Sequence, residues 1–151
     1  MKLDLQDDKH CFVCGPLNSS GFKLRFRRVE PGRLSARVRF DKRHQGFKNI
    51  VHGGLIGTIL DEVMVNLTWV DGTPAVTGTY TIRLSHPVAV GEEVVFEARS
   101  IRTTPRAVYV EAAVTRGADG LILASAEALC VRIKDAPPLS PEIIEEPDQK
   151  S

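Results

Sequence analysis

The chain has 151 residues, 42% of them hydrophobic, which is long enough for one domain around a single core. Its formal net charge of +1 excludes a strong overall attraction to nucleic acid or to an anionic membrane. The N-terminus has no apolar segment of signal-peptide type, and the longest apolar run, residues 55–70, is short and carries acidic groups, so we expect no membrane span. Three cysteines without an export signal favour free thiols, and we expect a cytoplasmic protein.

The first third of the chain predicts an irregular lead-in followed by two strands. Residues 1–20 show no clear period, whereas residues 22–27 and 34–40 alternate apolar and polar side chains around a Pro31-Gly32 turn. Nine lysines and arginines, against two acidic residues, fall between positions 23 and 43. These cations fit either the solvated face of the two strands or a patch for a phosphorylated ligand.

A polar loop over residues 41–49 leads to a predicted helix over residues 52–70. This helix is apolar on most faces and opens with His52-Gly53-Gly54. A buried carboxylate is costly unless something compensates it, yet the helix contains Asp61. The free backbone N–H groups of a glycine-rich helix start could hold an anion. A base and an oxyanion donor are two of the parts that a hydrolase needs.

Four further strands are predicted after the helix, since turn signals separate runs at about 75–86, 92–102, 106–116 and 121–133. Short turns favour antiparallel pairing, so we expect an α+β fold with one helix packed on an antiparallel sheet. The other face of so apolar a helix needs cover, for which a second subunit is the simplest candidate. We expect the folded domain to span residues 1–134, with a mobile, proline-rich acidic tail over 135–151.

Three groups of residues carry a family resemblance. They are Cys11–Gly15 with Asn18 and Gly21–Leu24; Val51–Gly54 with Asp61-Glu62; and Tyr80–Leu84 with Pro87 and Gly91-Glu92. Over residues 10–133 the chain resembles the hotdog-fold acyl-CoA thioesterases of the PaaI-like type. The resemblance implies a long central helix wrapped by an antiparallel sheet. It also implies dimers or dimers of dimers that hydrolyse acyl-CoA without a metal or other cofactor.

The resemblance also assigns roles in catalysis. Asp61 would be the general base or nucleophile, and the Gly53 N–H would polarise the thioester carbonyl. His52 would shape the helix start, more as a hydrogen-bonding residue than as a proton shuttle. Thr77, ten residues before Pro87, would help to hold the attacking water.

One position departs from the family pattern. Relatives often carry an amide side chain six residues before the histidine, where this chain has Gly46. Gln45 stands beside it and would serve after a small loop shift. We therefore assign Gln45, Asn49 and Gly54 to substrate binding.

The spacing on the helix predicts a shared site. His52 and Asp61 are nine residues apart, roughly 13 Å along a helix and on opposite faces. One chain therefore cannot bring both to a single carbonyl. Two antiparallel helices related by a twofold axis would pair Gly53 of one chain with Asp61 of the other, which gives two composite sites per dimer.

Plainer interpretations stay open for each of these residues. Asp61 could be a structural carboxylate bonded to a neighbouring hydroxyl, with Glu62, about 100° further around the helix, as the second choice for the base. The glycines could serve close helix packing, and Thr77 could be an ordinary strand residue.

Cys11 and Cys14 form a Cys-x-x-Cys pair beside His10. That spacing can bind zinc or perform redox chemistry, but no second pair exists and Cys130 stands alone. His44 and His86 would complete a site only if the fold brought them together. We assign the pair to packing or local structure and expect no metal.

Two other functions compete with hydrolysis. A hotdog hydratase or dehydratase is one, although its usual histidine and aspartate arrangement has no good match here. A non-catalytic acyl-CoA or acyl-carrier binding module is the other, and it would tolerate loss of Asp61. No DNA-reading segment is evident, so we expect no nucleic-acid partner.

Overall fold

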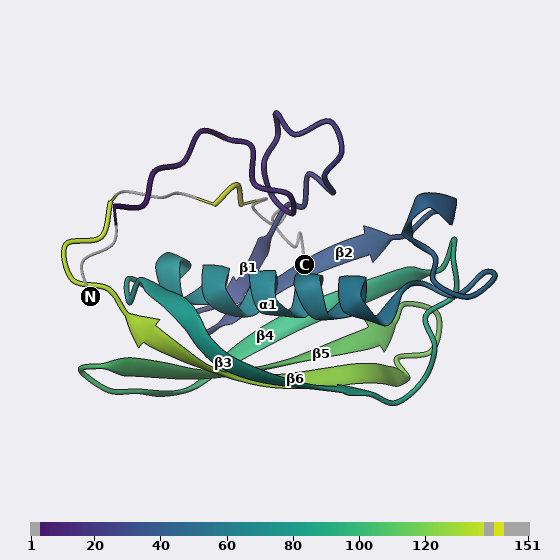
Figure 1. The fold of residues 1–151 in the computed structure, drawn as a ribbon. Helices are drawn as coiled ribbons and strands as arrows, with labels where there is room; N and C mark the ends of the chain where they lie inside the picture. Colours follow the sequence, from purple (N-terminus) through teal and green to yellow (C-terminus); the bar gives the residue numbers. More distant parts are fainter. Residues whose placement is uncertain (1–3, 138–140, 144–151) are drawn as a thin grey trace, which may run out of the picture.

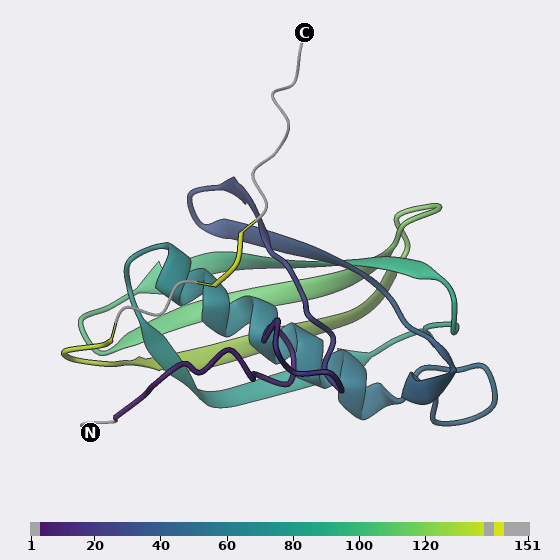
Figure 2. The ribbon, with the colours of Figure 1, turned by 90° about the horizontal axis from the view of Figure 1, so that it is seen from above.

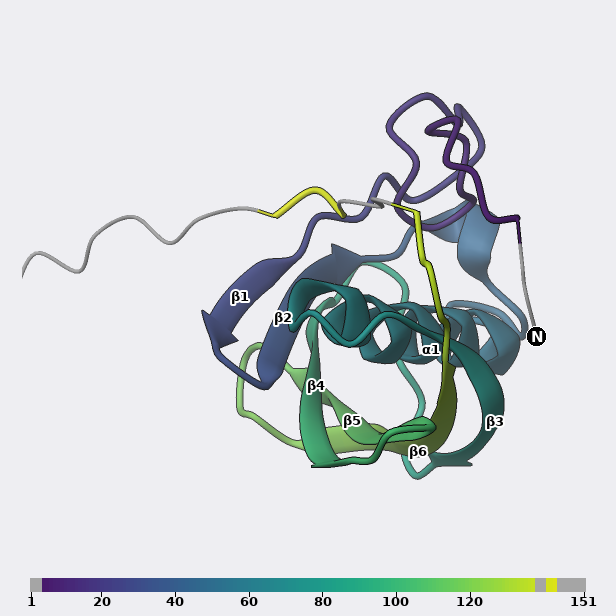
Figure 3. The same ribbon diagram turned by 90° about the vertical axis from the view of Figure 1, so that its left-hand side faces the viewer.

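The computed structural model describes residues 4–137 and 141–143, and its centre is one long helix against a curved sheet. Helix α1 (Gly53–Val70) lies across a six-stranded antiparallel sheet (Figure 1). Seen end-on, the sheet curves around α1 (Figure 3). The expected α+β class and hotdog arrangement are confirmed. The strands are β1 (Arg27–Glu30), β2 (Arg33–Arg39), β3 (Ala75–Leu84), β4 (Glu93–Thr103), β5 (Ala107–Arg116) and β6 (Ile122–Arg132).

The strand order β1-β2-β4-β5-β6-β3 leaves β1 and β3 at the two edges of the sheet. Consecutive strands from β4 to β6 pair through short turns. The helix connects β2 to β3, and β3 pairs with β6 along its whole length. The longer edge strand, β3, is therefore next to α1 in sequence and borders the sheet in space.

Side chains at three- and four-residue spacing hold α1 on the sheet. Ile59, Leu60, Val63 and Met64 are fully buried, as expected of one helix face turned to a core. The helix ends where the N–H of Asp71 bonds the carbonyl of Leu67. No helix of the described residues has the combined length and apolar character that crossing a membrane requires.

Five strands begin and end within two residues of their predicted bounds, but the first does not. The sequence predicts a strand over 22–27, whereas β1 begins at Arg27. The N–H groups of Phe22 and Leu24 bond the carbonyls of Phe12 and Val13 in the lead-in instead of a sheet neighbour. The alternation of burial is real, but the partner is the lead-in, which sequence periodicity cannot reveal.

The lead-in lies over the face of α1 that points away from the sheet (Figure 2). Val13 is buried in the core, and Cys11 contacts Glu62 of α1. Part of the cover expected from a second subunit thus comes from the same chain. The expected tail, 135–151, falls partly outside the described residues; within it, the Glu142 carbonyl accepts a bond from the N–H of Phe26 (3.1 Å).

Candidate active site

Within residues 4–137 and 141–143, one backbone N–H at the start of α1 has no hydrogen-bond acceptor. His52 is the N-cap, and its Nδ1 accepts a 2.9 Å hydrogen bond from the N–H of Gly54. The N–H groups of Leu55 and Ile56 bond the His52 carbonyl. The N–H of Gly53 has no acceptor among the described residues, so it is available to a bound oxygen. Gly54, predicted to bind substrate, has its N–H occupied by His52.

A cavity of about 650 Å³ opens in front of this helix start. Its wall includes Gly53 and is otherwise mostly apolar, with Ile56, Leu84 and Pro87. Phe47 at the same cavity is 85% exposed. A largely apolar cavity with few polar groups is the usual form of a small-molecule site.

Asp61 lies elsewhere on the helix, against β3. The Thr77 hydroxyl donates a 2.6 Å hydrogen bond to Asp61 Oδ1. The pairing of β3 with β6 shifts between Thr77 and Thr79, which is a β-bulge at Gly78. Bulges re-aim neighbouring side chains. A Cβ on Gly78 would stand 3.0 Å from a methyl of Val131, so glycine suits this bulge.

Cys130 is a neighbour of this pair that the sequence does not reveal. It is fully buried and lies opposite Thr77 in the β3/β6 register. Burial, and then the nearby charge of Asp61, raises the pKa of the Cys130 thiol to about 11. Only the pairing of β3 with β6 brings Cys130 opposite Thr77, which is more than fifty positions earlier in the chain.

Within one chain, the Gly53 N–H and the Asp61 carboxylate, which are the two halves of the expected site, lie apart. The cavity that contains Gly53 is lined by neither Asp61 nor Thr77. Asp61 is eight positions after Gly53 on the helix, about 12 Å along the axis. One chain therefore places the free N–H and the carboxylate in different environments.

The outer edge of β3 offers a surface for a second chain. Among the described residues, β3 pairs only with β6, so its other edge carries unpaired backbone groups. Tyr80 and Leu84 on this strand are about half exposed. A long exposed edge strand is a template for pairing with another strand.

Gln45 and Asn49 hold the loop before α1. Gln45 Oε1 accepts a 3.1 Å bond from the N–H of Asn49, whose side-chain oxygen accepts one from Lys42 Nζ (3.0 Å). Asn49 has a φ of 60°, which asparagine tolerates better than most residues. Neither residue lines the cavity, whereas Gly46 does.

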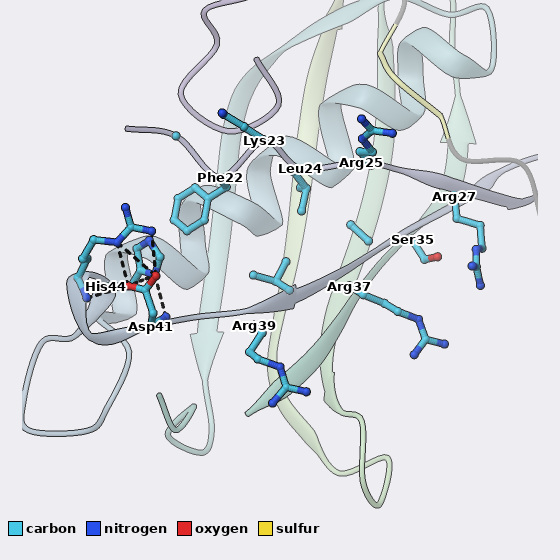
Figure 4. A pocket seen from close by; sticks show the side chains of 14 residues that line it. Phe22, Lys23, Leu24, Arg25, Arg27, Ser35, Arg37, Arg39, Asp41 and His44 are labelled. Carbon is cyan, nitrogen blue, oxygen red and sulfur yellow. Dashed lines mark hydrogen bonds and ion pairs between the residues drawn. The ribbon is translucent and has the colours of Figure 1, made fainter. Parts of the chain in front are cut away.

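A basic groove of about 370 Å³ lies over β1, β2 and the chain before them (Figure 4). Arg37 and Arg39 extend from the same side of β2, and Arg27 from β1 (Figure 4). The lining of the groove contains one carboxylate, that of Asp41, and six lysine or arginine side chains, which are Lys23, Arg25, Arg27, Arg37, Arg39 and Arg43. The pKa of Asp41 is lowered to about 2, chiefly by hydrogen bonds from Arg43.

Glu62, the second choice for the base, faces the lead-in. Its Oε1 is 3.6 Å from Cys11 Sγ and accepts a bond from Asn66 Nδ2 (2.9 Å). Burial, and then the charge of Cys11, raises the pKa of Glu62 to about 7. The pKa of Cys11 is lowered to about 5, mainly by a hydrogen bond from the Cys14 thiol. Glu62 therefore belongs to a cluster distinct from Asp61 and Thr77.

Comparison with known proteins agrees with this architecture. Residues 48–123 match the family model of the thioesterase superfamily. Acyl-coenzyme A thioesterase 13 of Homo sapiens is 25% identical over 96 residues, which are 62% of this chain and 69% of that protein.

Two solved structures share the fold. The thioesterase superfamily protein RHA08564 superposes with a TM-score of 0.76 at 24% identity over 82% of this chain, which spans 63% of that protein. A hypothetical thioesterase of Streptococcus pneumoniae TIGR4, solved with coenzyme A, gives 0.68 at 12% identity, over 72% of this chain and 84% of that one.

Fold and family together define a hotdog thioester hydrolase. The chain belongs to the thioesterase superfamily.

Proposed function

We propose that this protein hydrolyses acyl-CoA thioesters at a site shared by two protomers. The observation that carries the proposal is the 2.6 Å bond from Thr77 to Asp61, on the helix whose first N–H, that of Gly53, has no acceptor in the part of the chain that the structure describes. These are a held carboxylate and an oxyanion donor, the two groups that thioester hydrolysis requires. Curated relatives named acyl-coenzyme A thioesterase 13 support the substrate class.

In the proposed reaction, Asp61 acts as a general base. Thr77 occupies Oδ1, which leaves Oδ2 to accept a proton from water. The water oxygen attacks the thioester carbonyl, and the developing oxyanion accepts a hydrogen bond from the N–H of Gly53. Collapse of the tetrahedral intermediate breaks the C–S bond, and the CoA thiolate takes up the proton from Asp61.

The separation of the two halves supports a site between subunits. Pairing of two β3 edges across a twofold axis would set two α1 helices antiparallel. Gly53 of one protomer would then approach Asp61 of the partner subunit, and each dimer would hold two equivalent sites. The acyl chain would occupy the apolar cavity beside Gly53.

The basic groove is our candidate for the phosphates of coenzyme A. The loop before α1 contributes to both hollows, since Asp41 and His44 line the groove while Gly46 and Phe47 line the cavity. The side chains of Arg37 and Arg39 are about 60% exposed and pair with Glu93. Such surface pairs are weak, so phosphate oxygens can compete for these guanidiniums.

A spacing seen elsewhere supports the pairing of Asp61 with Thr77. Two further structures of the S. pneumoniae thioesterase carry an aspartate-to-alanine and a threonine-to-alanine substitution, sixteen positions apart in that chain. Asp61 and Thr77 have the same separation.

The test is thiol release from short, medium, long and aromatic acyl-CoAs, with Asp61→Asn as the control. We expect turnover on part of the panel, loss of it in Asp61→Asn, and nearly unchanged acyl-CoA binding by that variant. Near-full activity in Asp61→Asn would overturn the assignment of the base. Binding without turnover across the panel would instead favour the non-catalytic acyl-CoA or acyl-carrier module.

A further inference from the structure

A cluster of metal-ligating side chains joins the lead-in to α1. The two sulfurs of Cys11 and Cys14 and a carboxylate oxygen of Glu62 all lie within 4.8 Å of one another. Both cysteines are free thiols. Within residues 4–137 and 141–143, this is the one group of three or more such side chains that could hold an ion. Its members come from segments about fifty residues apart.

The backbone around the two cysteines is shaped to present both sulfurs on one side. The chain turns tightly, with the N–H of Gly15 bonded to the Cys11 carbonyl (2.9 Å). The backbone N–H groups of Val13 and Cys14 donate to Cys11 Sγ. A Cβ at Gly15 would lie 2.4 Å from the Cys11 nitrogen, so only glycine permits this turn. N–H donors aimed at a sulfur orient and stabilise a ligating thiolate.

Although the sequence alone favours packing or local structure for the cysteine pair without a metal, the added carboxylate of Glu62 changes this interpretation. We propose that Cys11, Cys14 and Glu62 bind one zinc-class divalent ion that fastens the lead-in to α1. In a tetrahedral zinc site with usual Zn–S and Zn–O lengths, sulfur and oxygen ligands are about 3.6 Å apart. Cys11 Sγ and Glu62 Oε1 are 3.6 Å apart. Two thiolates and one carboxylate match the ligand preference of zinc rather than that of magnesium or calcium.

The surroundings of Glu62 suit a carboxylate that ligates a metal ion. Asn66 Nδ2 donates to the same carboxylate oxygen and to the Glu62 carbonyl, which fixes the orientation of the side chain. A cavity of about 570 Å³ adjoins the cluster and is lined by Lys9, Asn66 and Trp69. Water from this cavity would take the fourth position of the ion. The site does not depend on the proposed hydrolysis, because Asp61 and Thr77 do not belong to it.

The decisive measurement is metal binding by the full chain. Protein stripped with a chelator under a phosphine reductant is titrated with Zn²⁺ and, separately, with Co²⁺. We expect one ion per chain and, for cobalt, thiolate-to-metal charge-transfer absorption. Cys11→Ser, Cys14→Ser and Glu62→Gln should each lower the affinity by more than about 10-fold, the scale at which even outer hydrogen bonds of a metal site are felt. Cys130→Ser, which changes a buried thiol outside the cluster, should bind as the unaltered protein does.

Several outcomes would overturn the proposal. They are binding of less than about a tenth of an ion per chain, cobalt spectra without charge-transfer bands, and an affinity of Cys11→Ser and Cys14→Ser equal to that of the unaltered protein. If a variant does not fold, the cobalt spectrum of the unaltered chain still decides between thiolate ligation and none. A stable disulfide that forms in preference to metal binding under mild reductant would also count against the site.

Proteolysis tests the fastening role. Lys9 lies two residues before Cys11, in the lead-in. Trypsin should cut after Lys9 faster in the metal-free chain than in the zinc-loaded chain, because release of the ion frees the segment. Equal cleavage rates with and without bound zinc would show that the ion does not hold the lead-in on α1.

Discussion

Thr77 Oγ1 donates to Asp61 Oδ1 at 2.6 Å, so a residue beside the bulge near the start of the edge strand β3 holds the carboxylate of the central helix. A hydrogen bond to a charged group contributes about 1.5–3 kcal/mol. The second carboxylate oxygen, Oδ2, has no hydrogen bond among the described residues. The position of β3 relative to α1 therefore determines the orientation of the Asp61 carboxylate.

The first prediction concerns Thr77. Thr77→Val removes the hydroxyl at nearly constant volume and should lower kcat about 10- to 100-fold, the kinetic equivalent of the lost bond. Thr77→Ser keeps the donor and should retain most of the activity. Steady-state kinetics on the preferred acyl-CoA measure both. Equal rates in the valine and serine variants would remove the hydroxyl from the mechanism.

The second prediction tests whether two chains share the site. Asp61→Asn and Gly53→Pro each disable one half of a composite site. In a mixed dimer, the intact Gly53 and the intact Asp61 meet at one of the two sites. Refolding the inactive variants together at equal amounts should restore about a quarter of the unaltered activity. If each chain forms its own site, mixing restores nothing.

Much of the fold is predictable because its signals are local. The helix is marked by apolar spacing and by its glycine-rich start, and five strands are marked by alternation between turn residues. The prediction of a strand over residues 22–27 is wrong, and it shows what sequence periodicity cannot reveal. Alternation reports which side chains are buried, but Phe22 and Leu24 bond the lead-in instead of the sheet.

The candidate site likewise combines features that the sequence predicts with contacts that it does not predict. His52, Gly53 and Asp61 belong to one contiguous helix and its N-cap, so helix geometry predicts their spacing from the sequence, and their roles in catalysis stay predictions. The effect of the Asp61 charge on Cys130 depends on strand register, and the contact of Cys11 with Glu62 depends on how the lead-in folds back. Such long-range contacts leave no periodic signal in a single sequence.

The third prediction concerns the basic groove. Arg37→Ala with Arg39→Ala should raise KM for acyl-CoA about 10-fold with little change in kcat, since phosphate contacts hold the substrate without touching the reacting carbon. The N-acetylcysteamine thioester of the same acyl group has no phosphates, so the unaltered protein and the double variant should hydrolyse it equally well. Arg99→Ala, on β4 and outside the groove, is the matched control. A parallel rise in KM for both thioesters would argue against phosphate binding.

The fourth prediction is a pH dependence of stability from Cys130. Its pKa in the folded chain is raised from 9.0 to about 11 by burial and by Asp61. Because the unfolded chain loses this proton first as pH rises, the stabilising contribution is complete below about pH 9 and is lost as pH rises through about 11. The free energy of unfolding, measured by denaturant titration between about pH 8 and 11, should therefore fall more steeply in the unaltered chain than in Cys130→Ala. Parallel curves would mean that the thiol is not held protonated.

The fifth prediction isolates the oxyanion donor. Gly53 is the first helical residue, where proline is tolerated because its missing N–H would have no partner within the helix. His52 has φ −59° and ψ 127°, a conformation that a following proline favours. Gly53→Pro should therefore leave α1 intact while it deletes one N–H.

Loss of one such donor elsewhere costs about 10²–10³ in kcat, and we expect a fall of that size in Gly53→Pro. Gly53→Ala is the control, because it retains the N–H and adds only the Cβ. That Cβ would meet the terminal methyl of Leu84 at 2.7 Å, a flexible group that can move aside, so the alanine variant should lose much less activity. Helix content and melting temperature of both variants check the fold. If both lose activity equally while folded, crowding at Leu84 explains the loss and the N–H does not.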